Sequence, residues 1–223
     1  MKTILLTLLL ISSVSFSQTF EINNIQDALT LKNDIGDKYS PYNPDIKGTP
    51  FVHSEYQNIT IKGVAMKGKY NAHQDYMEID TNGKIGFFVP AVEFRFDVIF
   101  TDLNATYRAF EFESLKFGFF RVLAHKDDSY ILSREYIKLN PEVKPKSNFD
   151  SHKPAKFQNK SDTYYIKFSG KDVVVELPTS KNNFYSVFGN HEDAIKSFIK
   201  KQKLSIDEEN DLVKIFTFYN TLQ

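Results

Sequence analysis

The sequence predicts an α+β protein: mainly an antiparallel β meander, folded as a sandwich or a partly open barrel, with a C-terminal segment of about three short helices. Three observations predict this class. Apolar and polar residues alternate from Phe51 onward, which is typical of half-buried strands. Asn82-Gly83 is typical of a two-residue hairpin turn. Beyond about residue 180 the apolar period lengthens to roughly 3.6 residues, as in amphipathic helices.

The N-terminus has the features of an export signal. Lys2 precedes the apolar run Ile4–Ile11, and Ser15 and Ser17 are small residues at the spacing of a signal-peptidase site. The run is too short to cross a bilayer, which takes about 20 residues. We therefore predict a signal peptide over residues 1–17, no transmembrane segment after its removal, and a location in the periplasm or outside the cell, with association with the outer membrane also open.

Composition excludes several kinds of chemistry. The chain has no cysteine, so disulfides, thiolate metal ligands and a cysteine nucleophile are excluded. Removal of the predicted signal peptide takes one lysine and no acidic residue, leaving 27 basic and 28 acidic side chains and a formal charge of −1. This balance does not favour nucleic acid as a partner. Residues 18–223 are enough for one domain.

Residues 19–50 are weakly patterned, with a short helix expected at "NIQDALTLKNDIG", capped by Asn24. Five stretches separated by turn-like residues then predict strands: "ITIKGVAMKGKY", "EFRFDVIF", "TYRAFEF", "FGFFRVLA" and "SYILSREYIKL". A further hairpin is expected where "TYYIKF" and "DVVVEL" flank Ser169-Gly170-Lys171. The spacing predicts a meander.

The Asn82-Gly83 turn also fixes a register. The opposed pairs are expected to be Thr81 with Lys84, Ile79 with Gly86, Glu78 with Phe87 and Met77 with Phe88. Both faces of this hairpin carry apolar side chains, so we expect the sheet to be covered on both sides, in a sandwich, a closed barrel or under helices.

Residues 140–162 contain three prolines and five lysines and are predicted to be a long polar loop or linker, followed over 163–223 by the hairpin and the helices. The first helix has an apolar stripe containing Phe184 and is expected to end at Gly189. The second is expected to be capped by Asn190 and the third by a Ser205–Glu208 capping box. Their stripes are Ala194, Ile195, Phe198 and Ile199, and Leu212, Ile215, Phe216 and Tyr219.

One polar stretch, "NAHQDYMEID" at 71–80, has the composition of a site. In an extended chain His73 and Asp75 point to one side while Glu78 and Asp80 point to the other, so the carboxylates diverge. A convergent acid and base or a metal site needs these groups within about 3 Å of a common atom. The stretch is therefore interpreted as a solvated hairpin connection.

The other polar clusters have ordinary structural explanations. "HKDDS" at 125–129 is typical of a turn, and Glu192 and Asp193 lie where acids favour a helix start. His53, His152 and His191 have no expected functional partner, and Asp80, Asn82 and Gly83 lack the remaining ligands of a calcium loop. A basic cluster is interpreted as a solvated helix face: Lys196, Lys200, Lys201 and Lys203. No catalytic, cofactor-binding or metal-binding residue is assigned, and no cofactor is expected.

Several phrases together resemble a group of exported bacterial proteins of unknown function that are common in Bacteroidetes-type genomes. They are "DIKGTPF", "YNAHQDYMEI", "FFRVLA" and the tail from "YYIKFSGKDVVVEL" to "DEENDL". The resemblance implies secretion across the inner membrane and a β-rich body with a helical tail. It implies no catalytic residues.

These observations favour a non-catalytic protein of the cell envelope that binds another envelope protein or helps to organise an assembly. The alternative is a protein that binds a small apolar ligand in a mouth lined by six phenylalanines: Phe94, Phe96, Phe110, Phe112, Phe117 and Phe119. An envelope hydrolase is a lesser alternative.

Overall fold

A computed structural model describes residues 43–81, 83–92, 95–145 and 151–223. The helix expected near Asn24 lies outside these residues. The strands are β1 Gln57–Ile61, β2 Val64–Asn71, β3 Tyr76–Thr81, β4 Lys84–Phe88, β5 Val98–Phe100, β6 Ala105–Glu113, β7 Lys116–Lys126, β8 Ser129–Arg134, β9 Ile137–Asn140, β10 Lys156–Asn159, β11 Thr163–Lys167 and β12 Val175–Glu176. The helices are α2 Lys181–Ser186, α3 Glu192–Gln202 and α4 Glu209–Tyr219, with short 3-10 turns at Thr101–Leu103 and Gly189–His191.

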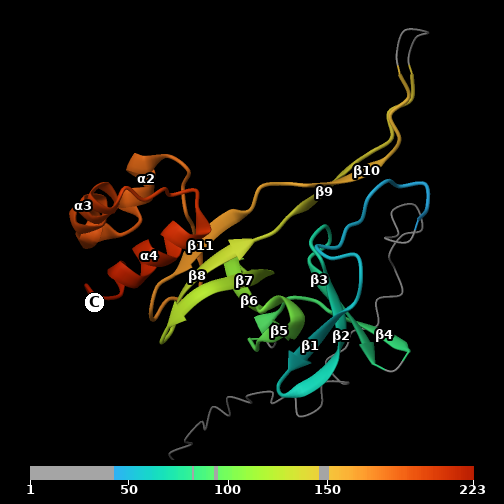
Figure 1. The fold of residues 1–223 in the computed structure, drawn as a ribbon, viewed down its shortest axis with the longest axis horizontal. Helices are drawn as coiled ribbons and strands as arrows, with labels where there is room; N and C mark the ends of the chain where they lie inside the picture. Colours follow the sequence, from blue (N-terminus) through green and yellow to red (C-terminus); the bar gives the residue numbers. More distant parts are fainter. Residues whose placement is uncertain (1–42, 82, 93–94, 146–150) are drawn as a thin grey trace, which may run out of the picture.

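Ten strands form one open antiparallel sheet in the order β12-β11-β8-β7-β6-β5-β1-β2-β3-β4. The predicted α+β class, a β meander followed by three helices, is confirmed (Figure 1). The predicted register of the β3–β4 hairpin is also confirmed, from Met77 opposite Phe88 to Thr81 opposite Lys84. The Asp80 carboxylate accepts the Gly83 N–H at 2.7 Å, so it closes the turn as the hairpin interpretation requires.

Three apolar clusters hold the fold together. The first is built mainly by the N-terminal strands and contains Ile59, Ile61, Met77, Ile79, Phe88, Phe100 and Phe119. The second packs the three helices against β8 and β11 and contains Ile131, Ile166, Phe184, Ile195, Leu212, Ile215 and Phe216. The third lies on the opposite face of β6–β8 and contains Phe110, Phe120, Tyr130, Leu132, Tyr165 and Val174.

A polar row separates the first two clusters on their shared face of the sheet. Tyr107 pairs with Arg121 across β6 and β7, Arg121 pairs with Ser133, and Ser133 pairs with Tyr164 on β11. Side chains directly opposite in an antiparallel sheet lie on the same face. The row therefore crosses four strands between the N-terminal core and the helices.

Some predicted elements have different bounds. Among the described residues of "EFRFDVIF", 95–100, only the three residues of β5 form a strand. "SYILSREYIKL" is divided at Glu135-Tyr136 into β8 and β9. β9 leaves the main sheet and pairs with β10 in a separate two-stranded sheet. Part of the stretch expected to be a loop, residues 140–162, is therefore strand.

Most residues of the predicted helix stripes are buried, with Ala194 and Phe198 only partly so, but three caps were assigned wrongly. The N-cap of α3 is His191 and not Asn190, and that of α4 is Glu208, neither with a side-chain capping bond. Ser205 belongs to the preceding turn, where the Asp211 carboxylate accepts its N–H at 2.9 Å. The first helix ends at Ser186 with Val187 as its C-cap and not at Gly189, which has a positive φ of 54° but begins the following 3-10 turn. In the part of the chain that the structure describes, no helix has the length and apolarity to cross a membrane.

Candidate functional site

The β9–β10 pair forms an arm that projects from the body of the protein. β9 follows β8 after two residues, and β10 runs back toward β11, so the arm continues the β8–β11 pair beyond the main sheet (Figure 1). A further pairing outside the strands, between Val143 and Lys153, lengthens it, with each N–H donating to the other residue's carbonyl at 2.8 and 3.0 Å. We call residues 136–160, as far as the structure describes them, the ribbon.

The two faces of the ribbon differ in chemistry. Ile137 and Phe157 are buried against the first core, with Leu139 beside them. The opposite, outward face carries exposed Lys138, Gln158 and Lys156, with Asn140 between them. Asn140 Nδ2 donates to Gln158 Oε1 at 3.0 Å, which links the two strands on this side.

The outward face is basic along β9 and β10. Lys160 and Tyr136 extend it toward the body, both exposed and joined by a backbone hydrogen bond of 2.9 Å. Within the described residues, Lys138, Lys156 and Lys160 form no ion pair with a carboxylate. The paired strands therefore hold three ammonium groups on one surface. Farther out, Glu142 pairs with His152 at 2.9 Å.

Arg121 fixes the base of the ribbon. Glu135 follows β8 and Asp162 precedes β11, and their carboxylates lie 4.0 and 3.7 Å from the Arg121 guanidinium. Glu209, in the first turn of α4, is hydrogen-bonded to the same guanidinium. Arg121 thus connects the end of β8 and the start of β11, where the ribbon leaves the sheet, to the start of α4.

Neutral hydrogen-bond donors complete this cluster. Tyr107 Oη donates to Glu135 at 2.6 Å, and Ser133 Oγ donates to Asp162 at 2.6 Å. Burial raises the pKa of Glu135, and the nearby Asp162 carboxylate adds to this, although the Tyr107 hydrogen bond and Arg121 oppose it. The surroundings of Glu135 at the base of the ribbon therefore favour its protonated form more than water does.

A second arginine fixes the turn between β2 and β3 against the neighbouring strands. Arg134 Nη2 donates to Asp75 Oδ2 at 2.9 Å. Asp75 Oδ1 accepts the Tyr70 hydroxyl at 2.9 Å and the Phe119 N–H at 3.1 Å. Burial raises the pKa of Asp75 even though all three donors favour its charged form. The Arg134 guanidinium also lies 4.1 Å from the centre of the Phe112 ring.

The stretch "NAHQDYMEID" does form a hairpin connection, but the expectation that it is solvated was wrong. Asp75 is in the cluster just described, and His73 Nδ1 lies 2.9 Å from the Ile137 carbonyl oxygen, which ties the turn to β9. Glu78 is completely buried elsewhere, 3.4 Å from the Lys69 ammonium and hydrogen-bonded to Tyr56. The structure therefore places Asp75 and Glu78 in separate structural clusters.

The remaining polar clusters lie apart from one another. The "HKDDS" stretch contains a tight turn at Asp127-Asp128 between β7 and β8. Glu192 and Asp193 occupy the first turn of α3. The lysines of the α3 segment are exposed: Lys196, Lys200, Lys201 and Lys203. No group of three or more histidine or acidic side chains suited to a metal ion occurs among the described residues.

The phenylalanines proposed to line an apolar mouth are divided between different cores. Phe119 belongs to the first cluster and Phe110 to the third, on the opposite face of the sheet. Phe112 packs with Phe110's cluster, whereas Phe96 packs with the first. Phe94 lies outside the described residues.

Comparison with models of known protein families, with curated proteins and with solved structures gives no match. The candidate site therefore depends on the geometry of this chain alone. Sequence patterns did not identify the ribbon or its anchors. The one sequence feature that could have indicated the ribbon is the set of five lysines in residues 140–162. On a pair of strands such lysines form a basic surface, whereas the sequence was interpreted as a loop or linker.

Proposed function

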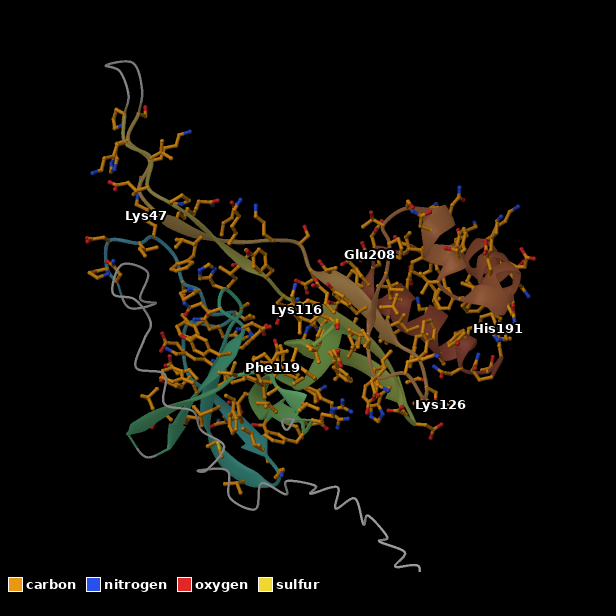
Figure 2. All side chains as sticks on the ribbon, turned by 180° about the vertical axis from the view of Figure 1, so that it is seen from behind. Lys47, Lys116, Phe119, Lys126, His191 and Glu208 are labelled. Carbon is orange, nitrogen blue, oxygen red and sulfur yellow. The ribbon has the colours of Figure 1, made fainter. Side chains whose placement is uncertain are left out.

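We propose that this protein is a non-catalytic binding protein of the cell envelope, and that the outward face of the ribbon binds an acidic surface of another envelope protein. The observation that carries the proposal is the charge of that face: Lys138, Lys156 and Lys160 are exposed on one side of the strand pair and form no ion pair with a carboxylate among the described residues. Figure 2 shows the β9–β10 arm from behind, with side chains extending from it. The export signal predicted at residues 1–17 supports a place outside the inner membrane.

Charge complementarity of this kind steers a partner and fixes its register more than it adds affinity. Three exposed lysines alone are a weak attraction, because salt screens exposed charges beyond about 8 Å at physiological ionic strength. The ribbon adds a fixed arrangement, since Asn140 and Gln158 between the lysines supply neutral donors and acceptors. Tyr136 at its base adds an exposed aromatic ring, a residue type enriched at interfaces.

The alternative of a small apolar ligand has no comparable support. The five proposed lining residues that the structure describes do not share one cavity, because Phe110 and Phe119 face opposite sides of the sheet. Nor does any observation on the described residues favour an envelope hydrolase.

Site-specific photo-crosslinking in the native host tests the proposal. The crosslinking amino acid replaces Gln158 on the outward face or, as a control, Thr217 on the exposed side of α4. We expect one discrete adduct from position 158 and none from position 217. Recovery of only the uncrosslinked monomer from both positions would reject the proposal.

Charge reversal then identifies the interaction. The variant with Lys138→Glu, Lys156→Glu and Lys160→Glu should lose the adduct while keeping the circular dichroism spectrum of the unchanged chain. The matched control reverses three lysines of α3 instead: Lys196, Lys200 and Lys201. Equal loss of the adduct in both variants would show a general effect of net charge and would contradict a site on the ribbon.

A further inference from the structure

A hollow lies at one end of the third core, away from the ribbon. After β11 the chain crosses back to β6, where the Val174 N–H donates to the Glu111 carbonyl at 2.8 Å, and then pairs with β11 again as β12. This crossing segment closes the face of β6, β7, β8 and β11 over the aromatic residues of the third core. The hollow has a volume of about 100 Å³, and its walls include Arg95, Arg108, Tyr130 and Lys167.

The charges that line the hollow are sorted by depth. The Lys167 side chain is 8% exposed, and the Tyr130 ring is equally buried. The carboxylates stand at the rim: the Asp128 side chain is 58% exposed and that of Asp172 is 77% exposed. The hydrogen-bond donors of Lys167 and Tyr130 therefore lie at the bottom of the hollow, and the carboxylates of Asp128 and Asp172 lie at its entrance.

The floor retains hydrogen-bonding capacity after its own contacts are counted. Arg108 donates from Nε to Asp97 at 2.8 Å and from Nη1 to the Tyr130 hydroxyl oxygen at 2.6 Å. Because Tyr130 accepts this bond, its own hydroxyl hydrogen is available, and no acceptor for it is found among the described residues. Lys167 uses two of its three donors on Asp128, at 2.8 and 3.0 Å.

We infer that this hollow binds an oxyanion: a carboxylate, sulfate or phosphate group. Its remaining donors are the Tyr130 hydroxyl, the guanidinium of Arg108 and the third N–H of Lys167. Its volume of about 100 Å³ corresponds to roughly three waters at about 30 Å³ each, which suits one such group. Arg95 at the rim, paired with Asp172 at 3.4 Å, can turn toward the anion.

An adjoining hollow accommodates the rest of a larger ligand. It shares Arg108 and Tyr130 with the first, has a volume of about 250 Å³, and is lined in part by Val122, Leu123 and His125. The His125 ring stacks on Tyr130, with centroids 5.6 Å apart. The anionic group is therefore expected to belong to a small organic molecule with a partly apolar body.

Thermal unfolding of the mature chain tests the inference with three probes: sodium acetate, sulfate and phosphate. Each is compared with sodium chloride at matched ionic strength, and the comparison of planar with tetrahedral anions distinguishes the ligand classes. We expect at least one probe to raise the Tm of the unchanged chain more than that of Arg108→Gln, because a ligand that binds only the folded state stabilises it, whereas the general stabilisation by sulfate and phosphate acts on both chains alike. Equal Tm values in all four salts would overturn the inference.

Two variants locate the effect. Tyr130→Phe keeps the ring and removes one donor to the anion, which should weaken binding roughly tenfold. Arg108→Gln should abolish the shift, whereas Lys153→Gln on the distant ribbon should retain it in full. Titration by NMR, following the Gly170 amide beside Asp128, gives the same ranking if a variant is less stable. Binding that is unchanged in both Tyr130→Phe and Arg108→Gln would refute the site.

Discussion

Replacing Arg121 with methionine is the most informative perturbation of the ribbon base. The variant leaves three carboxylates without their shared cation: Glu135, Asp162 and Glu209, whose side chains are 18%, 26% and 37% exposed. Removing one partner of a fully buried ion pair costs about 3–5 kcal/mol. Water reaches these side chains in part and screens them, so we expect a loss of about 2–3 kcal/mol at pH 7.

Urea unfolding at pH 7 and pH 5 measures this loss. The destabilisation should be smaller at pH 5, because carboxylates freed from Arg121 can take up protons there. Adding Glu135→Gln to Arg121→Met should recover part of the stability. Arg95→Met is the matched control, since its pair with Asp172 is exposed and is expected to contribute less than about 1 kcal/mol. A loss below about 0.5 kcal/mol for Arg121→Met, or an equal loss at both pH values, would refute this account.

Three further predictions concern single sites. Gly118→Ala should lower the free energy of unfolding in urea by about 1–3 kcal/mol, because an added Cβ would lie 3.0 Å from both the Arg134 guanidinium and the Asp75 carboxylate. Phe120→Ala should cost about 3–5 kcal/mol by the same measurement, whereas Leu115→Ala at an exposed turn should change stability by less than about 0.5 kcal/mol. Burial raises the pKa of Glu135, so the stability linked to its protonation is present below the ordinary glutamate pKa and is lost as pH rises through the folded-state value. Unfolding of Glu135→Gln from pH 4 to 7 should therefore show a shallower decline than the unchanged chain; parallel curves would contradict it.

The features that the sequence predicted correctly are local. The register of Met77 with Phe88 follows from a two-residue turn a few positions away. The buried stripe of α4, including Leu212 and Ile215, follows from a period of about 3.6 residues. In both cases the determining residues are close together in the chain.

The ion pairs of the ribbon base and of the turn between β2 and β3 are not local, and no spacing rule finds them. Asp75 and Arg134 are 59 residues apart, and Arg121 and Glu209 are 88 apart. The stretch after Asn140 was predicted to be a loop because it contains three prolines and five lysines and few residues that could enter a core. Its strand β10 forms because Phe157 is buried against the first core, a contact made with distant parts of the chain.

The base of the ribbon combines charged groups where apolar side chains would serve stability equally well or better. An isolated two-stranded hairpin is marginal in water, so the ribbon depends on its attachments to the body. Apolar side chains at the base of the ribbon would stabilise it without fixing its orientation. The planar guanidinium of Arg121, in contrast, carries its donors in a fixed geometry. The guanidinium is hydrogen-bonded to Glu209 at the start of α4 and lies within 4.0 Å of the carboxylates of Glu135 and Asp162, which flank β8 and β11, so its charge holds the two strand ends beside the helix. Such a joint suits a surface whose binding depends on where its lysines point.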